Sequence, residues 1–375
     1  MICIKKYFCA VLSLILFLTR TPVCCAETAV SYILTEAETG TVIESENADM
    51  RRSASYMSKL MSLLIVAEDI QEGKYKLSDE VTASDSVSGT EGSVIWLEKG
   101  DSISIEELVK STVIGNANDA VTVLAENSRN SVKEFVKAMN EKAVGLGLKN
   151  TFFCSPYGYY NPREYTSAHD IAVICSELSR YSFLTPYFTT WRDFVKNDTV
   201  ELVNENTLAR TYDRHIGFKA CHSENSGYCI AEGGKNDSGT VYIAVVLGAE
   251  SEDISFSTAK KAVNRGFSDF KVTAVMFPDE MLMPLKVKNG TDFAVEIQLE
   301  QQELLVIPRG VSELKNVTVI PEYINAPVRR GQPIGTVGFY NGDTLVSEGR
   351  IVVKNDVEKL SFTYVLKQNL LNITK

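Results

Sequence analysis

The sequence predicts an α+β protein, in which an antiparallel sheet with helices packed on it and a helical lobe precede a small all-β domain. Strand-like segments lie at both ends of the region 27–271 and flank a mostly helical middle. After about Phe270 the helical patterns stop, and alternating strands with Asn-Gly turns follow. A chain of 375 residues is long enough for two hydrophobic cores. We therefore expect two domains, 27–271 and 272–375, and the second resembles a β-sandwich with a short tail.

Residues 1–26 have the pattern of a secretory signal. A basic start precedes an apolar run from Tyr7 to Leu18, and Ala26 is a small residue at the expected cleavage point. We expect cleavage after Ala26 and an exported protein, located outside the cell, in the wall or at the periplasmic face of the membrane. The alternatives are an uncleaved anchor and a lipid-modified cysteine. The run is short for a membrane span, so membrane association is allowed but not indicated.

Charge and cysteine spacing exclude several kinds of partner. The formal charge is −10, and loss of the signal removes three basic residues and no acids. An acidic chain argues against a nucleic-acid partner. The four remaining cysteines, Cys154, Cys175, Cys221 and Cys229, do not have metal-ligand spacing, so we expect no metal site and no cofactor. A Cys221–Cys229 disulfide is compatible with export but cannot be deduced from the sequence.

The elements of the first domain follow from caps, turns and periodicity. Ser104 and Ser131 each precede a glutamate by three residues, which is a helix-start pattern, and Ser167 begins a further helix. Runs rich in β-branched residues predict strands. In order, we expect a hairpin of 30–36 and 41–44, a helix after Tyr56, helices 104–113, 120–126, 131–145 and 166–178, strands 228–232 and 240–247 joined by the turn 233–239, and a closing helix 257–266.

The second domain shows strand patterns throughout. Segments 285–290, 293–297 and 334–342 alternate apolar and polar residues, with turns at Asn289 and Asn341. Residues 362–375 place apolar side chains on one helical face. We expect this tail to pack on the β domain, with a membrane-surface helix as the alternative.

The most informative stretch is Ser53–Lys59 and the apolar run that follows it. Met57, Leu60, Met61, Leu64 and Ile65 recur at helical spacing, which predicts a buried helix. A lysine at the start of such a helix needs a partner or a chemical role, because burying an ammonium is costly. A hydroxyl one turn before a lysine is a known nucleophile–base arrangement. Here Tyr56 stands three residues before Lys59, and Ser55 stands four before it.

Further segments occur in a fixed order along the chain. They are Asn47–Asp49, Gly92–Gly100, Asn116–Ala120, Met139–Ala143, Leu148–Phe153, Tyr165–Ala168, Leu202–Leu208, Gly217–Cys221 and Ala326–Gly335. Over nearly the whole mature chain this order resembles the low-molecular-mass penicillin-binding proteins, the serine-type D-alanyl-D-alanine carboxypeptidases. The resemblance implies a β-lactamase/transpeptidase-like first domain and a ligand that is a peptidoglycan stem peptide ending in D-Ala-D-Ala, with weak binding of β-lactams.

The family's chemistry is acyl transfer. The resemblance implies that a serine attacks the carbonyl between two D-alanines, a lysine takes the serine's proton, and an acyl-enzyme is then hydrolysed. This chain departs from the family at three motifs. Alignment without a gap puts Tyr56 at the nucleophile position, Asn116 replaces a relay serine, and Ala220-Cys221 replaces Thr-Gly.

Three lysine and asparagine positions keep the family's residue. These are Lys59, Asn118 and Lys219. We therefore expect a catalytic region of Lys59, Asn118, Tyr56 and Ser55, and a substrate-binding region of Lys219, Asn116, Ala220 and Cys221.

We interpret Tyr56 as an aromatic plug hydrogen-bonded to Lys59. Ser55 is either a shifted nucleophile that reaches Lys59 or, as we favour, a helix N-cap. Cys221 and His222 are strand neighbours that point to opposite faces, so we expect a pocket-lining cysteine and an exposed histidine. His169 and His215 have no partner identifiable from the sequence.

The sequence thus predicts an impaired or inactive copy, a pseudoenzyme that binds or regulates at the cell wall during its remodelling. The first alternative is an active serine carboxypeptidase that uses Ser55 with Lys59. The second is a structural wall protein whose cleft holds no ligand.

Overall fold

The computed structural model describes residues 30–159, 161–274, 278, 281, 283–300, 304–311 and 313–364. The predicted signal, residues 1–26, and most of the predicted tail lie outside these residues. Within the described part, no helix is long and apolar enough to cross a membrane.

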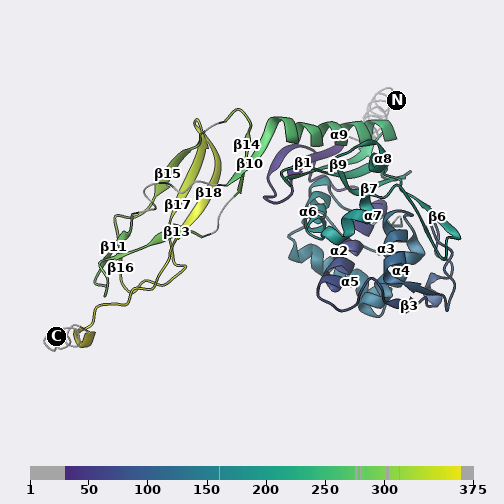
Figure 1. Ribbon diagram of the computed structural model, residues 1–375, viewed down its shortest axis with the longest axis horizontal. Coiled ribbons are helices and arrows are strands. Elements are labelled where there is room, and N and C mark those ends of the chain that lie inside the picture. Colours follow the sequence, from purple (N-terminus) through teal and green to yellow (C-terminus); the bar gives the residue numbers. More distant parts are fainter. Residues whose placement is uncertain are drawn as a thin grey trace, which may run out of the picture.

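A five-stranded antiparallel sheet joins the two ends of the first domain, as predicted. Its strands are β1 (Ser31–Glu36), β2 (Val42–Glu46), β7 (His215–Ser223), β8 (Gly227–Lys235) and β9 (Val241–Ala249), in the order β2-β1-β9-β8-β7. β1 and β9 pair directly, with Tyr32 opposite Val246. β9 is buried along nearly its whole length because helices cover both faces of the sheet. α9 (Glu252–Asp269) packs on one face, and α6 (Ala168–Ser179) packs on the other, together with the helical lobe (Figure 1).

The predicted turn at 233–239 is wrong at its start, because β8 continues through both glycines to Lys235. These glycines are needed for close packing. A Cβ on Gly233 would lie 2.8 Å from the ring of Phe218, and one on Gly234 would lie 2.5 Å from a methyl of Val263. The turn itself is shorter and is held by the side chain of Asn236, which accepts a hydrogen bond from the Thr240 amide.

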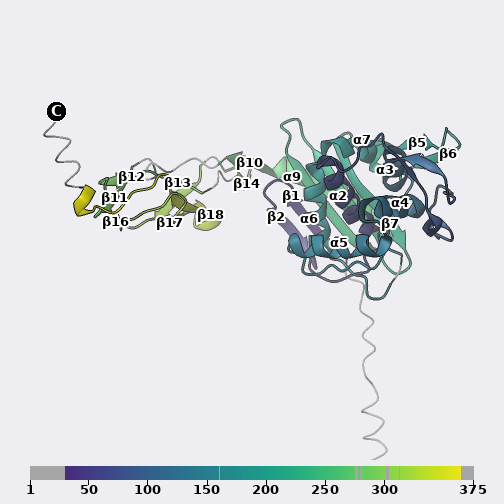
Figure 2. The same cartoon turned by 90° about the horizontal axis from the view of Figure 1, so that it is seen from below.

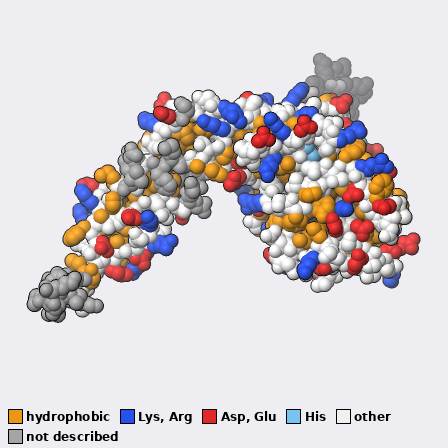
Figure 3. Space-filling model, in the orientation of Figure 1, with side chains coloured by type: hydrophobic (Ala, Val, Ile, Leu, Met, Phe, Trp, Pro, Cys, Tyr) orange, Lys and Arg blue, Asp and Glu red, His pale blue; other side chains and the backbone are white. Residues whose placement is uncertain are grey.

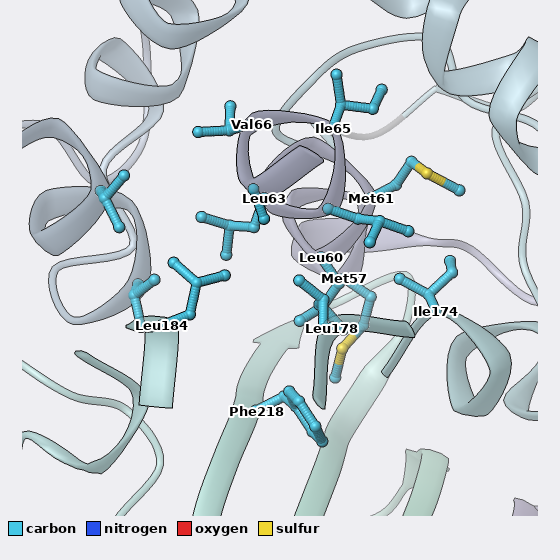
Figure 4. Packing of buried hydrophobic residues seen from close by; sticks show 14 of the residues in the cluster. Met57, Leu60, Met61, Leu63, Ile65, Val66, Ile174, Leu178, Leu184 and Phe218 are labelled. Carbon is cyan, nitrogen blue, oxygen red and sulfur yellow. The ribbon is translucent and has the colours of Figure 1, made fainter. Parts of the chain in front are cut away.

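The helix that carries Lys59 runs through the middle of the lobe. α2 (Ser58–Gln71) is preceded by a 3-10 turn, η1 (Ser55–Met57), and is buried on nearly all sides from Ser58 to Ala67. Figure 4 shows its side chains packed against Ile174 and Leu178 of α6, against Phe218 of β7 and toward Leu184. A helix that is buried on nearly every side is a core helix, which confirms the predicted burial.

The other helices and short strands of the first domain surround α2. The predicted caps at Ser104, Ser131 and Ser167 are confirmed, since each side chain accepts a backbone N–H three residues on. α9 starts earlier than predicted, because Ser251 caps it. The remaining elements are α3 (Ile105–Val113), α4 (Asn118–Arg129), α5 (Val132–Gly145), α7 (Thr185–Thr189), α8 (Leu208–Thr211), β3 (Glu80–Thr82), β4 (Ser102–Ser104), β5 (Arg192–Val195), β6 (Val200–Val203), η2 (Asp85–Val87) and η3 (Ser182–Leu184).

The second domain is built from strands and has its own core. It extends away from the end of α9 (Figures 1 and 2). β10 (Phe270–Ala274) follows α9 directly and pairs with β14 (Leu304–Pro308). A separate apolar cluster that includes Val328, Val337 and Ile351 fills its interior. The other strands are β11 (Leu285–Lys288), β12 (Ala294–Val295), β13 (Ile297–Leu299), β15 (Lys315–Val319), β16 (Tyr323–Asn325), β17 (Pro333–Asn341) and β18 (Thr344–Val353).

On the face of the molecule in Figure 3, acidic and basic side chains are interspersed. That face carries no extended basic surface of the kind that binds nucleic acid.

Candidate active site

Four buried polar residues from three parts of the fold meet at the start of α2. Lys59 lies in the first turn of α2, Asn116 and Asn118 lie where α3 passes into α4, and Lys219 lies on β7. All four are nearly or fully buried. Asn116 adopts a left-handed backbone conformation with φ 55° in the turn between α3 and α4. The structure thus brings together these four members of the predicted site.

The amide oxygen of Asn116 connects the two lysines. Lys59 Nζ donates to Asn116 Oδ1 at 2.8 Å and to Asn118 Oδ1 at 2.6 Å. Lys219 Nζ donates to the same Asn116 Oδ1 at 2.7 Å. The two asparagines therefore supply the acceptors that buried amines require.

Burial and the charge of Lys219 favour the neutral form of the Lys59 amine. Burial lowers the pKa of Lys59 well below its ordinary value, and the charge of Lys219 lowers it further. Burial also lowers the pKa of Lys219, while Glu205 opposes this shift. A neutral amine can accept a proton, so Lys59 retains the chemistry of a general base.

Two contacts of this network were missed by the sequence analysis. Asn116 Nδ2 donates to Glu205 Oε1 at 3.1 Å, and Asn118 Nδ2 donates to the Glu91 carbonyl at 2.6 Å. Glu205 lies within the segment Leu202–Leu208, whose residue order had been recognised. Glu205 is 89 residues from Asn116 in the sequence, and periodicity and spacing cannot reveal a contact at that separation.

The ring of Tyr56 faces the amine of Lys59. Lys59 Nζ lies over the ring, 4.6 Å from its centroid. The predicted hydrogen bond between them is wrong, because the described hydrogen bonds of Lys59 go to the two asparagines. A Cβ on Gly92 would lie 3.6 Å from the Tyr56 hydroxyl, so the side chain reaches toward that backbone. Burial raises the pKa of Tyr56, so its phenol stays protonated.

The described hydrogen bond of the Ser55 hydroxyl goes to β7 and not to Lys59. Ser55 Oγ donates to Ser223 Oγ at the end of β7, at 3.2 Å, and the φ of Ser55 is 45°. The N-cap interpretation is wrong, because α2 has Met57 at its N-cap and Ser55 caps no backbone N–H there. Gly158 packs on the Ser55 carbonyl, where any side chain would collide with the oxygen. This contact fixes the backbone that leads into Tyr56.

The first residue of α2, Ser58, carries a second buried hydroxyl close to that of Ser55 in the sequence. Ser58, beside Lys59, donates a hydrogen bond to the Glu164 carboxylate, and both side chains are buried. Burial raises the pKa of Glu164 to about 7, although the bonds from Ser58 and the Cys154 amide lower it. Glu164 was not singled out from the sequence, because an isolated glutamate in a loop gives no signal of burial.

Residues 220 and 221 lie on opposite faces of β7. Ala220 packs in the apolar cluster beside α9, whereas Cys221 belongs to the cluster on the lobe side, as does Met57. Cys221 also lines a pocket of about 460 Å³, and His222 is exposed and stacks on Tyr228 at 4.1 Å. This confirms the expected pocket-lining cysteine and exposed histidine.

The two remaining histidines have partners that the sequence did not reveal. His215 Nδ1 lies 2.9 Å from Glu232 in the interior, and His169 Nδ1 lies 2.9 Å from Asp49 at the surface. Among the described residues, no group of three or more His, Cys, Asp or Glu side chains could hold a metal ion.

Comparisons with known proteins agree with this geometry. A family model described as D-alanyl-D-alanine carboxypeptidase matches residues 19–251, and one described as Penicillin-binding protein 5, C-terminal domain, matches residues 270–359. The chain is 31% identical to the D-alanyl-D-alanine carboxypeptidase DacF of Bacillus subtilis (strain 168), over 93% of this chain and 91% of that protein. It is 28% identical to DacC, also a D-alanyl-D-alanine carboxypeptidase, of Escherichia coli (strain K12), over 88% and 85%.

A solved structure extends the comparison to three dimensions. Penicillin binding protein 5 from Haemophilus influenzae superposes with a TM-score of 0.82 at 25% identity, covering 88% of this chain and 97% of that one. The predicted fold and family are thereby confirmed. The chain belongs to the D-alanyl-D-alanine carboxypeptidase family, with a β-lactamase/transpeptidase-like fold followed by a penicillin-binding protein 5 C-terminal domain.

Proposed function

We propose that this protein binds peptidoglycan stem peptides ending in D-Ala-D-Ala and cleaves them little or not at all. The observation that carries the proposal is the position of Tyr56, whose ring covers the amine that a nucleophile would need. In a serine protease, loss of the nucleophile lowers kcat by about 10⁶. A protonated phenol that contacts Lys59 through its ring face does not replace that nucleophile.

Binding is supported by the amine of Lys219. Lys219 uses one of its three N–H donors on Asn116, as far as the described residues go, which leaves donors for a peptide carboxylate. Glu205 and Asn116 add polar groups beside it. The cleft thus keeps groups that recognise a carboxylate without the group that attacks a carbonyl.

Calorimetric titration with a peptide ending in D-Ala-D-Ala tests the binding. We expect saturable binding that weakens at least roughly tenfold in Lys219→Ala, because one charge-assisted hydrogen bond contributes about 1.5–3 kcal/mol. Lys235→Ala is the matched control, since Lys235 is exposed at the end of β8. An absence of binding by the wild-type protein would instead favour a structural wall protein with an empty cleft.

The rival active enzyme, with Ser55 as nucleophile, is tested by a fluorescent penicillin. Ser55 Oγ is directed to Ser223, so we expect no covalent adduct by intact-protein mass spectrometry. A stoichiometric adduct that maps to Ser55 and disappears in Ser55→Ala would establish the rival.

The remaining sequence predictions belong to the same proposal. Residues 1–26 would direct export and be removed, leaving the domains 27–271 and 272–375 at the cell wall. In that location an inactive copy would act by occupying stem peptides during wall remodelling.

A further inference from the structure

Two cysteines lie opposite each other on neighbouring strands near the candidate site. Cys221 of β7 is directly opposite Cys229 of β8, and both are free cysteines. Opposed residues of an antiparallel pair point to the same face, with Cα atoms about 4.5–5.5 Å apart. Disulfides form between Cα atoms about 4.4–6.8 Å apart. The strand pairing therefore places the two cysteines within the range of Cα separations at which disulfides form.

A small reagent can reach the pair from solvent. Cys221 and Cys229 are only 5% and 3% exposed, yet both line the pocket of about 460 Å³, together with Trp191, Glu205 and Tyr228. The other two cysteines do not line this pocket. Cys175 is fully buried on α6, and Cys154 lies in a loop beside Glu164.

The pKa values of the two thiols shift in opposite directions. The hydrogen bond from Cys221 lowers the pKa of Cys229, and the same contact raises the pKa of Cys221. Because the thiolate is the attacking form, these directions favour Cys229 as the first sulfur to attack.

We propose that Cys221 and Cys229 are a redox-active dithiol that reacts with small-molecule disulfides to close a cross-strand disulfide beside the cleft. The Cys229 thiolate attacks one sulfur of the external disulfide, which forms a mixed disulfide and releases one thiol. Cys221, deprotonated by solvent, then attacks the Cys229 sulfur and releases the second thiol. The protein loses two protons and two electrons, and the external disulfide becomes two thiols. The new bond fixes the edge strand that carries Lys219.

Peptide mapping tests the proposal on the whole folded protein. The reduced protein is exposed to oxidised glutathione, alkylated with iodoacetamide and digested with trypsin. Residues 220–235 form one tryptic peptide that contains both thiols and no internal Lys or Arg. We expect this peptide to carry no alkyl group and to be about 2 Da lighter than the dithiol form, through loss of two hydrogen atoms. Two alkylated cysteines, or a reaction that stops at one glutathione, would overturn the proposal.

Variants and an unfolded control test whether the paired strands, or only the short separation of the two cysteines in the sequence, bring about disulfide formation. Cys154→Ser should close the ring as the wild type does, whereas Cys221→Ser should stop with glutathione on Cys229. Ring closure should be at least roughly tenfold faster in the folded protein than in urea, because β7 and β8 hold the sulfurs together. Equal rates in the two states would contradict the proposed role of the strands.

Discussion

Lys59 and Lys219 donate hydrogen bonds to the same atom, Oδ1 of Asn116, at 2.8 and 2.7 Å. The amide oxygen of Asn116 accepts a hydrogen bond from each buried amine, and so stabilises both lysines in the interior. Asn116 is also one of the positions at which this chain departs from the serine of the family pattern. The departure therefore has a structural role here, and it leads to a first prediction.

Asn116→Ala should destabilise the protein by about 3 kcal/mol or more, because two buried amines lose an acceptor and the left-handed backbone is strained. The matched control is Asn130→Ala, since Asn130 is exposed and has φ 60°, close to the 55° of Asn116. The control should lose only the backbone part, about 1–2 kcal/mol. Urea unfolding measures the loss of stability in both variants. Equal losses would show that the hydrogen bonds from Lys59 and Lys219 to Asn116 contribute nothing.

Glu164 should make stability depend on pH. Its pKa is raised from 4.5 to about 7, so between these values the unfolded chain gives up a proton that the folded chain keeps. The stability that protonated Glu164 contributes to the folded state is fully present below pH 4.5. It is lost as the pH rises through about 7, and the free energy of unfolding falls by up to roughly 3 kcal/mol. Glu164→Gln should abolish this loss in urea unfolding from pH 4.5 to 7.5. Glu224→Gln, at an exposed turn residue, should keep the wild-type profile, and an unchanged profile in Glu164→Gln would refute the prediction.

Gly158 should tolerate no side chain. A Cβ there would collide with the Ser55 carbonyl oxygen, and its φ is 76°. Gly158→Ala should cost about 3 kcal/mol or more, from left-handed strain and overpacking together. Gly147→Ala is matched in backbone, with φ 73°, but has open space, so it should cost only about 1–2 kcal/mol. Thermal unfolding compares them, and similar Tm values would mean that the turn before Tyr56 is not held by this contact.

Restoring one motif should restore little activity. Tyr56→Ser supplies a hydroxyl and uncovers Lys59, but Asn116, Ala220 and Cys221 still differ from the family pattern. We expect covalent labelling by fluorescent penicillin to be slow in Tyr56→Ser and much faster when Asn116→Ser, Ala220→Thr and Cys221→Gly are added. Full labelling by the single variant would show that the other two motifs are not limiting.

Local patterns were sufficient to predict most of the fold. The caps at Ser104, Ser131 and Ser167 and the apolar run after Tyr56 are short-range signals, and each element formed where it was expected. Gly233 and Gly234 misled the prediction, because a glycine that permits close packing looks the same in a sequence as one that permits a turn. The start of α9 was placed too late, since the cap at Ser251 stands six residues before Ser257, where the helix was predicted to begin.

The site was only partly predictable. The ordered motifs identified Lys59, Asn118 and Lys219, and the fold brings them together. The orientation of Tyr56, the direction of Ser55 and the partners Glu205 and Glu164 depend on contacts between segments far apart in the chain. Such contacts follow from tertiary packing, which spacing along one chain does not encode.

The most direct test of the account is the release of D-alanine from a pentapeptide ending in D-Ala-D-Ala, measured with pure protein at saturating peptide. With the amine of Lys59 covered by the Tyr56 ring, we predict release at the level of buffer alone while the peptide still binds. Release at the rate of active carboxypeptidases of this family, assayed in parallel, would contradict the account.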